Sequence, residues 1–358
     1  MRDDAIGLLR ELADAHGAPG YEGEVRSIFA RELNEVGTIS TDGLGSVFCE
    51  SGQGPRVLVA GHMDEVAFRV QSITPEGFIK FVPLGGWWPH TLLAQRVAIR
   101  TRNGGRLLGV VASKPPHFLP EAERSRVLAI ADMFIDVGAS SRADLEENYG
   151  VQIGDPVVPV SAFSAMHSED LFMAKAFDNR VGMACAIQAA KMLAVQAPPN
   201  TLIACGTVQE ELGVRGATTA ANKAKPDVAI VLEGTPADDT PGFSQNTAQG
   251  ALGQGVQIRL QDPTAMMNPA LVELAQNLAR KNDIAHQMAV RDSGGTDARA
   301  FQLSNLGVPT IVLGVPARYI HSHNSIIDIR DYLAMLDLTV ALVRSLDQEQ
   351  VDHLTSYL

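Results

Sequence analysis

The chain has 358 residues, of which 46% are hydrophobic and 20% are charged, and its formal net charge is −12. This length allows two domains with a large core, and the composition excludes a disordered or fibrous protein. The acidic balance and the lack of a basic run argue against a nucleic-acid partner.

Apolar residues recur at helical spacing in the first 35 residues. They form two sets, one on each side of Gly17-Ala18-Pro19-Gly20: Ile6, Leu9 and Leu12, then Val25, Phe29 and Leu33. A three-to-four-residue period with a glycine- and proline-rich break between the sets is typical of two amphipathic helices joined by a turn. We therefore expect two surface helices packed on a core.

Four later segments have the pattern of buried strands, and each runs into polar residues. The segments are 56–61 before His62, 202–205 before Glu210 and Glu211, 227–232 before Glu233, and 309–314 before His321 and His323. A helix-like run, 181–193, follows Asp178. Open α/β sheets place their sites just outside the carboxyl ends of strands, so these side chains are expected to meet in one crevice.

A different pattern interrupts the α/β sequence after His62. Short alternating segments at 68–70, 78–82, 96–100 and 107–111 predict strands, and a proline-containing loop is expected over 112–123. Helical patterns return only after about residue 163. The sequence thus predicts a discontinuous α/β domain, 1–66 and 164–358, with an inserted β-rich domain at 67–163.

Two further helices are expected near the C-terminus. Asn268 can cap a helix that starts at Pro269 and runs through Leu278, because proline costs nothing at the first helical position. A last helix is expected over 331–346, where leucine and valine recur.

Cysteine use and hydropathy indicate the compartment. Cys49, Cys185 and Cys205 are far apart and form no Cys-x-x-Cys pair, which favours buried thiols in a reducing compartment. No run approaches the roughly 18 apolar residues of a membrane span, and the acidic start is unlike a signal peptide. We expect a cytoplasmic protein without a membrane partner.

The adjacent glutamates Glu210 and Glu211 carry the strongest chemical signal. Adjacent glutamates usually lie on a solvated helix face, but the apolar segment before them and Gly213 after them favour a strand end. Two carboxylates at such a point repel unless a cation neutralises one and the other holds or takes a proton. The pair therefore predicts half of a metal site.

Five motifs, in order along the chain, resemble the M42 family of metal-dependent aminopeptidases, which includes deblocking, leucyl and glutamyl enzymes. They are Gly61-His62-Met63-Asp64-Glu65, Ala176-Phe177-Asp178-Asn179-Arg180, Gln209-Glu210-Glu211-Leu212-Gly213, Gly294-Gly295-Thr296-Asp297-Ala298 and Arg318-Tyr319-Ile320-His321-Ser322. The resemblance implies a mixed-sheet, zinc-peptidase-like α/β catalytic domain. It also implies that the small inserted domain, PDZ-like or barrel-like, helps to build dimers, which in some members go on to twelve-subunit shells.

Position by position, the resemblance implies two divalent metal ions per subunit. One would be held by His62, Asp178 and Glu233, and the other by Glu211, His321 and the same Asp178. Mixed histidine and carboxylate ligands suit zinc, cobalt or manganese better than calcium. Asp64 is expected to accept the other imidazole N–H of His62.

Alternatives remain open at three of these positions. Asp178 could cap a helix, or could cap and bridge together, since aspartate is a preferred N-cap. Asp238 or Asp239 could replace Glu233, and His323 could replace His321. The motif match favours Glu233 and His321.

Glu210 is the expected catalytic base, which takes a proton from the attacking water and gives it to the departing amine. The resemblance also implies substrate contacts at Gly295, Thr296 and Asp297, and at His323 near the mouth of the pocket. The expected activity is release of N-terminal residues with neutral side chains from short peptides. The alternatives are a dinuclear amidohydrolase acting on N-acyl amino acids and a non-catalytic assembly protein of the same fold.

Overall fold

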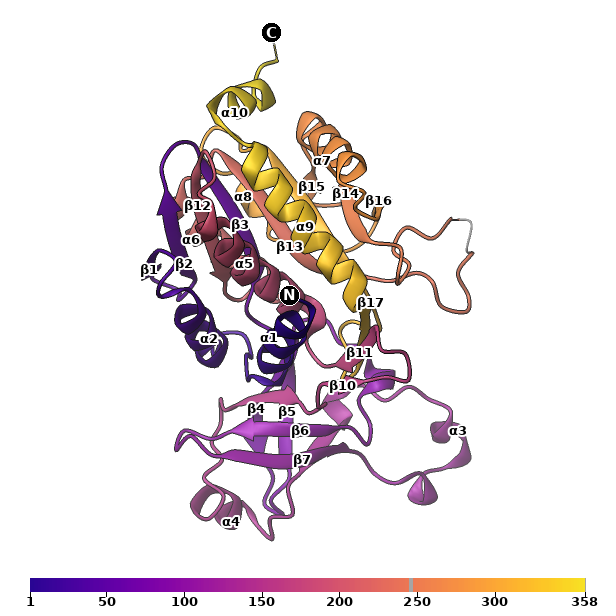
Figure 1. The fold of residues 1–358 in the computed structure, drawn as a ribbon. Helices are drawn as coiled ribbons and strands as arrows, with labels where there is room; N and C mark the ends of the chain where they lie inside the picture. The colour runs from indigo at the N-terminus through magenta and orange to yellow at the C-terminus, as the bar shows by residue number, and fades with distance from the viewer. Residues whose placement is uncertain (245–246, 358) are drawn as a thin grey trace.

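A mixed sheet forms the centre of the larger of two lobes (Figure 1); the computed structural model describes residues 1–244 and 247–357, and within them the sheet has 12 strands. Its main path runs β1 (Thr38–Thr41), β2 (Val47–Gly52), β12 (Thr201–Thr207), β3 (Arg56–His62), β13 (Val228–Pro236), β17 (Thr310–Arg318), β18 (Ser325–Asp328), β11 (Leu171–Ala174) and β10 (Ser164–Ala165). Beside β17 lie β14 (Val256–Asp262), β15 (Ala265–Met266) and β16 (His286–Val290).

The central strands β12, β3, β13 and β17 are parallel, and this fixes where their ends lie. Thr207 pairs with His62 across β12 and β3, and Glu233 pairs with Gly314 across β13 and β17. These strands are buried almost throughout, as expected for strands covered on both faces. Their carboxyl ends therefore share one edge of the sheet.

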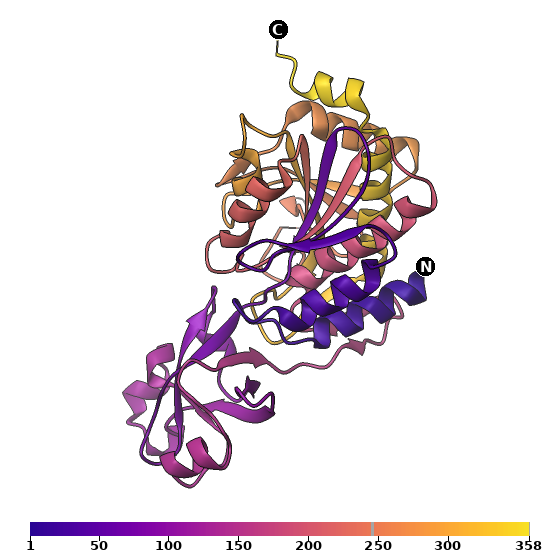
Figure 2. The ribbon, with the colours of Figure 1, turned by 90° about the vertical axis from the view of Figure 1, so that its left-hand side faces the viewer.

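Helices cover both faces of the sheet, as Figure 2 shows. One layer contains α1 (Arg2–Asp14), α2 (Gly23–Leu33), α5 (Phe177–Val195), α7 (Pro269–Lys281) and α9 (Ile329–Ser345). The opposite face carries α6 (Arg215–Ala224) and α8 (Ala298–Gln302), which contact each other, and α10 (Gln348–Leu354) follows α9. The predicted helices near both ends of the sequence are confirmed, and Asn268 caps α7 by accepting the Leu271 N–H at 3.0 Å.

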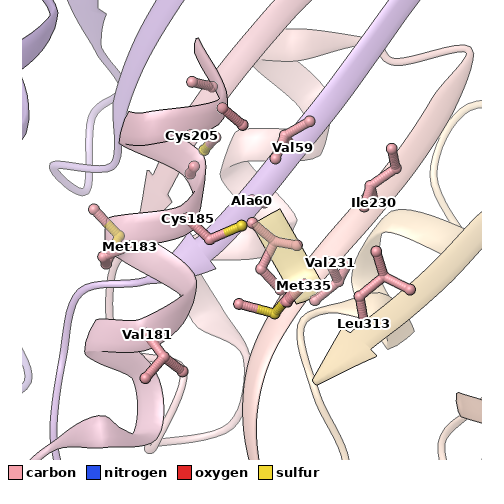
Figure 3. Close-up of a cluster of buried hydrophobic side chains, with 14 of the residues drawn as sticks. Val59, Ala60, Val181, Met183, Cys185, Cys205, Ile230, Val231, Leu313 and Met335 are labelled. Atoms are coloured by element: carbon pink, nitrogen blue, oxygen red, sulfur yellow. The ribbon is translucent and has the colours of Figure 1, made fainter. Parts of the chain in front are cut away.

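The core lies between α5 and the parallel strands. Figure 3 shows Val181, Met183 and Cys185 of α5 in a cluster of buried side chains, with Cys185 directed toward Ala60 of β3, and with Val231 of β13 in the same cluster. Every residue of α5 from Asn179 to Ile187 is buried, and most of these residues are small or apolar, which lets the helix pack closely on the strands. Among the described residues the three cysteines are free and buried, which fits the predicted buried thiols.

The second lobe is a closed six-stranded barrel, the lower part of Figure 1. Its strands, in order around the barrel, are β4 (Ala67–Ile73), β5 (Ile79–Leu84), β8 (Phe134–Asp136), β7 (Arg106–Ala112), β6 (Arg96–Arg100) and β9 (Pro156–Pro159). The barrel encloses its own apolar core around Phe68, Phe81 and Ile135. The barrel-like form of the expected β-rich domain is therefore confirmed.

Short helical segments decorate the barrel. They are η1 (Pro89–Thr91), η2 (Pro116–Phe118), α3 (Glu121–Arg124), η3 (Ile130–Asp132) and α4 (Arg142–Glu147). The expected loop at 112–123 contains η2 and the start of α3. Within the described part of the chain, no helix is long and apolar enough to cross a membrane.

Candidate metal centre

The parallel strands deliver four of the predicted ligand segments to one edge of the sheet. His62 is the last residue of β3, and Glu233 lies within β13 rather than at its end. Glu210 and Glu211 follow β12, and His321 follows β17. Together with Asp178, these six side chains form one cluster, which we term the Asp178 centre.

Asp178 lies in the middle of this cluster and directs its two oxygens to two histidines. Its Oδ1 lies 3.1 Å from Nε2 of His62, and its Oδ2 lies 3.4 Å from Nε2 of His321. One carboxylate thus spans two groups of side chains. This is the arrangement expected of a carboxylate that serves two neighbouring cations.

The remaining carboxylates divide between the two histidines. From Nε2 of His62, Glu233 Oε2 lies at 3.7 Å and Glu210 Oε2 at 3.9 Å; from Nε2 of His321, Glu211 Oε2 lies at 3.5 Å. Three sets of ligand atoms each lie within 4.8 Å of one another: His62, Asp178 and Glu233; Asp178, Glu211 and His321; and His62, Glu210 and Glu211. The first two sets have the same members as the two ion sites inferred from the sequence.

The backbone around Asp178 is shaped by Asn179 and a glycine. Asp178 makes no helix-capping bond, so the interpretation of this residue as an N-cap is wrong; the Asn179 Oδ1 accepts the Gly182 N–H at 2.9 Å instead. A Cβ on Gly234 would lie 2.9 Å from the Asp178 nitrogen, so only glycine lets β13 approach this closely. The Asp178 carboxylate is therefore free to face the centre.

The turn that carries Glu210 and Glu211 is held by buried carboxylates. Asp64 accepts the N–H of Glu210 at 3.0 Å and the N–H of Glu211 at 3.1 Å, and Glu22 accepts the N–H of Gln209 at 3.2 Å. Gln209 has a φ of 54°, a left-handed conformation that needs such support in a residue with a side chain. The two glutamates are thus presented on a fixed backbone.

Asp64 also contacts His62, though not in the single way expected. The nearest partner of His62 Nδ1 is the backbone oxygen of Asp64 at 3.0 Å, and the Asp64 carboxylate lies at 3.5 Å. Either contact favours a proton on Nδ1, which leaves Nε2 as the nitrogen that faces Asp178. The main partners of the Asp64 carboxylate are the two backbone N–H groups.

Burial and mutual repulsion shift the ionisation of the cluster. Burial raises the pKa of Glu211 to about 8 and the pKa values of Glu210 and Glu233 well above their usual range. Burial opposes a charge on His321, but the Asp178 and Glu211 carboxylates raise its pKa to about 9. Without cations, the acids can share the cavity only by holding protons themselves or on the histidines.

These residues fit a pair of metal ions by their own chemistry. Within residues 1–244 and 247–357, no lysine or arginine forms an ion pair with Asp178, Glu210, Glu211 or Glu233. The Oε1 of Glu211 is buried and has no hydrogen-bond partner among the described residues. Mixed imidazole and carboxylate donors with an unpaired oxygen suit zinc, cobalt or manganese.

The rival carboxylates after Glu233 are engaged elsewhere. Asp238 accepts the N–H groups of Gln249 and Gly250 and pairs with Arg291 at 3.0 Å. Asp239 forms a bidentate ion pair with Arg318, whose Nε donates to Oδ1 at 2.7 Å and whose Nη2 donates to Oδ2 at 2.6 Å. Both hold the loop after β13, whereas Glu233 faces His62.

The residues expected to contact substrate are placed unevenly. Gly295 is exposed, whereas Thr296 and Asp297 are buried, and Asp297 binds the hydroxyl of Thr207 beneath the glutamate turn. Burial raises the pKa of Asp297 to about 6. His323 is also buried, 5.5 Å from the Trp87 ring. Glu22 also supports the site, because its carboxylate accepts the Gln209 N–H. It was not predicted from the sequence, since it lies outside the five motifs.

An open cleft of about 780 Å³ lies beside His321, between the barrel and the loop after β17. Trp87 and Trp88 line one side and Tyr319 and Ile320 the other. Trp87 is half-buried and stacks on Phe68 at 4.6 Å between ring centroids, whereas Trp88 is 64% exposed. The cleft gives a molecule at the Asp178 centre a wall of aromatic side chains.

A cluster of buried carboxylates and histidines at the carboxyl edge of a parallel sheet is typical of metal-dependent peptidases and related hydrolases. A family model described as M42 glutamyl aminopeptidase matches residues 45–338, and one described as AMPT matches residues 3–29. The chain belongs to the M42 family of aminopeptidases, and it is an enzyme that hydrolyses peptide bonds.

Individual relatives agree with this assignment. The TET aminopeptidase of the marine sediment archaeon Thaumarchaeota archaeon SCGC AB-539-E09 is 40% identical, with a TM-score of 0.95 over 99% of both chains. The glutamyl aminopeptidase of Lactococcus lactis subsp. cremoris is 35% identical over 98% of both chains. The TET1 peptidase of Pyrococcus horikoshii, which can assemble into a tetrahedron or a large octahedral shell, is 31% identical, with a TM-score of 0.86 over 96% of this chain and 100% of its own.

Proposed function

We propose that this enzyme is a dinuclear metal-dependent aminopeptidase that releases N-terminal residues from short peptides. The observation that supports this most directly is the position of Asp178, whose two oxygens face His62 at 3.1 Å and His321 at 3.4 Å. A carboxylate shared in this way lets two cations lie close together, because its negative charge screens their repulsion.

In this proposal His62, Asp178 and Glu233 hold one ion, and Asp178, Glu211 and His321 hold the other. Zinc or cobalt fits the donor set best, and manganese is also compatible with it. When bound, such ions polarise a carbonyl group and make water a better nucleophile at neutral pH.

Glu210 is the proposed general base. It is next to a proposed ligand but belongs to neither proposed ligand set, and its Oε2 lies 3.9 Å from His62 Nε2, within the same cavity. The Asp64 carboxylate fixes its backbone through the N–H bond at 3.0 Å. Glu210 would take a proton from the attacking water and return it to the departing amine.

We further propose a preference for neutral N-terminal side chains. The cleft beside His321 is lined by Trp87, Trp88, Tyr319 and Ile320, without a lysine, arginine or carboxylate among its lining residues. A wall rich in aromatic side chains, without lysine, arginine or carboxylates, favours uncharged side chains over charged ones. The preference would therefore differ from the one in the name of the Lactococcus relative.

The self-association named for the Pyrococcus relative supports a similar assembly here. We propose that the chain forms dimers through the barrel and that dimers join into a twelve-subunit shell in the cytoplasm. A closed shell would admit short peptides and exclude folded proteins. Light scattering on the purified protein would give the number of subunits, and a monomer at working concentration would contradict the assembly.

Chelation followed by titration of single metals tests the central proposal. We expect the metal-free enzyme to lose activity and to regain it with zinc or cobalt, with two ions bound per subunit by elemental analysis. Activity that survives complete removal of transition metals would overturn the proposal, as would saturation at one ion per subunit.

Chromogenic amides separate the candidate reactions. We expect hydrolysis of leucyl and alanyl amides, weaker hydrolysis of glutamyl amides, and none of the N-acetylated analogues. Preferred cleavage of the N-acetylated compounds would favour the amidohydrolase alternative. A metal-loaded protein inactive on all of these amides and on short peptides would favour the non-catalytic alternative.

A further inference from the structure

A second buried group of charges lies outside the Asp178 centre. Glu65, Lys175 and Arg180, which we term the Glu65 cluster, are 1%, 4% and 0% exposed. Lys175 Nζ donates to both Glu65 oxygens at 2.7 Å, and Arg180 Nη2 donates to Glu65 Oε1 at 3.0 Å. Two cations thus share one carboxylate away from water.

Three buried charges stabilise a core less effectively than apolar side chains would. Removing ions from water costs several kcal/mol each, and apolar residues of similar volume are often at least as stabilising. Lys175 and Arg180 both lose some basicity to burial, which lowers the pKa of each, although the Glu65 carboxylate opposes that shift. The cluster therefore calls for a role beyond packing.

The positions of the three residues suggest that role. Glu65 lies on the same segment as His62, whereas Lys175 and Arg180 stand on either side of Asp178. The ion pairs consequently bind the backbone before and after Asp178 to the segment that carries His62. Among the described residues, only Glu65 links both flanks of Asp178 to that segment through side-chain hydrogen bonds.

The cluster also engages the turn after α1. Lys175 Nζ donates to the Ala15 oxygen at 2.9 Å, and Arg180 Nη1 donates to the Leu12 oxygen at 2.8 Å. The Gly17 N–H donates to Glu65 Oε1 at 3.2 Å. A Cβ at Gly17 would lie 2.3 Å from Arg180 Nη2, so the turn is shaped around the guanidinium.

We propose that the Glu65 cluster is a positioning device, which fixes Asp178 relative to His62 and makes the turn after α1 part of the support of the metal centre. The proposal rests on the proposed function, in which Asp178 and His62 hold cations. Residues that orient ligands in this way typically contribute 10–100-fold to metal affinity or activity.

Lys175→Met is the sharpest test because it leaves Glu65 and Arg180 as a balanced pair, so the protein should still fold. We expect cobalt affinity, measured by calorimetry on the metal-free protein, to fall about 10–100-fold. At saturating cobalt, kcat should fall while KM stays unchanged. In the metal-free protein, amide hydrogen exchange should accelerate over residues 176–182.

Gly17→Ala tests the same device without changing any charge. Its new methyl group would displace Arg180, so cobalt affinity should fall in the same direction as in Lys175→Met. Gly7→Ala is the matched control, because nothing lies within 4 Å of a Cβ at that position. It should leave cobalt affinity unchanged.

The outcomes separate this inference from the proposed function. Wild-type cobalt affinity and kcat in both Lys175→Met and Gly17→Ala, with only a lower melting temperature, would show a purely structural cluster and overturn the inference. Unchanged cobalt binding in Asp178→Ala would instead overturn the proposed function.

Discussion

The Asp178 centre and the Glu65 cluster both draw residues from the segments around His62 and Asp178, but they differ in charge balance. In the Asp178 centre, four carboxylates face two histidines and form no ion pair with any described lysine or arginine. In the Glu65 cluster, one carboxylate meets two cations of the chain itself. A buried acid whose partners are supplied internally supports the fold, whereas a buried excess of acids calls for cations from outside.

Among the variants that test this difference in charge balance, Asp178→Ala should have the largest effect. We expect Asp178→Ala to lose both ions together and all measurable activity, because one side chain serves both proposed sites. Elemental analysis and peptide hydrolysis check this. Asp170→Ala, at a surface carboxylate paired with Arg2, is the control and should keep both. Retention of either ion at full occupancy in Asp178→Ala would contradict a shared ligand.

Glu210→Gln separates proton transfer from metal binding within the Asp178 centre. The amide keeps the shape of the side chain but cannot accept the proton, so metal content should be unchanged and kcat should fall by about 10²–10⁴-fold. Glu211→Gln is the matched variant and should instead lose the ion near His321. An unchanged rate in Glu210→Gln would remove its proposed role.

The sequence predicted the Asp178 centre better than the Glu65 cluster, and the reason is physical. His62, Glu210 and Glu233 follow or lie in apolar strand segments, and parallel strands bring their ends to one edge. Glu65, by contrast, meets residues more than 100 positions away, Lys175 and Arg180, with no periodic pattern to connect them. Contacts of this kind depend on how distant segments come together in the folded chain, which local spacing does not encode.

Two smaller differences between the sequence-based predictions and the structure also have local causes. Asp178 and Asn179 are both good caps, and only the close approach of Gly234 shows why the aspartate turns to the centre while Asn179 caps the helix. The strands β8 and β9 of the barrel have only 3 and 4 residues, too few for an alternating pattern to stand out.

The burial of His16, together with the nearby cations, should also make the metal-free protein sensitive to acid. Burial, together with the charges of Lys175 and other nearby cations, lowers the pKa of His16 to about 3. The unfolded chain takes up this proton near pH 6.5, so His16 supports stability above that pH and the support is lost as pH falls toward 3. The loss amounts to about 1.4 kcal/mol per pH unit at most.

The measurement is the free energy of unfolding of the metal-free protein at pH 7, 5.5 and 4. His16→Leu should reduce the dependence of this free energy on pH, because leucine takes no proton in the folded or the unfolded state. The substitution removes no hydrogen bond between described residues, since both ring nitrogens of His16 lack partners among them. Equal slopes for the variant and the wild type would show that His16 does not contribute.

The smallest effect is expected at Asp239, a carboxylate close in sequence to the Asp178 centre but balanced like the Glu65 cluster. Its partner is Arg318, and the pair is partly exposed, so Asp239→Asn should cost about 1 kcal/mol or less of stability and leave both ions bound. Glu233→Gln should fold equally well yet weaken the ion near His62, because an amide carries no charge to offset the cation. If Asp239→Asn lost that ion and Glu233→Gln kept it, charge balance in the metal-free protein would be a poor guide to which acids bind metal.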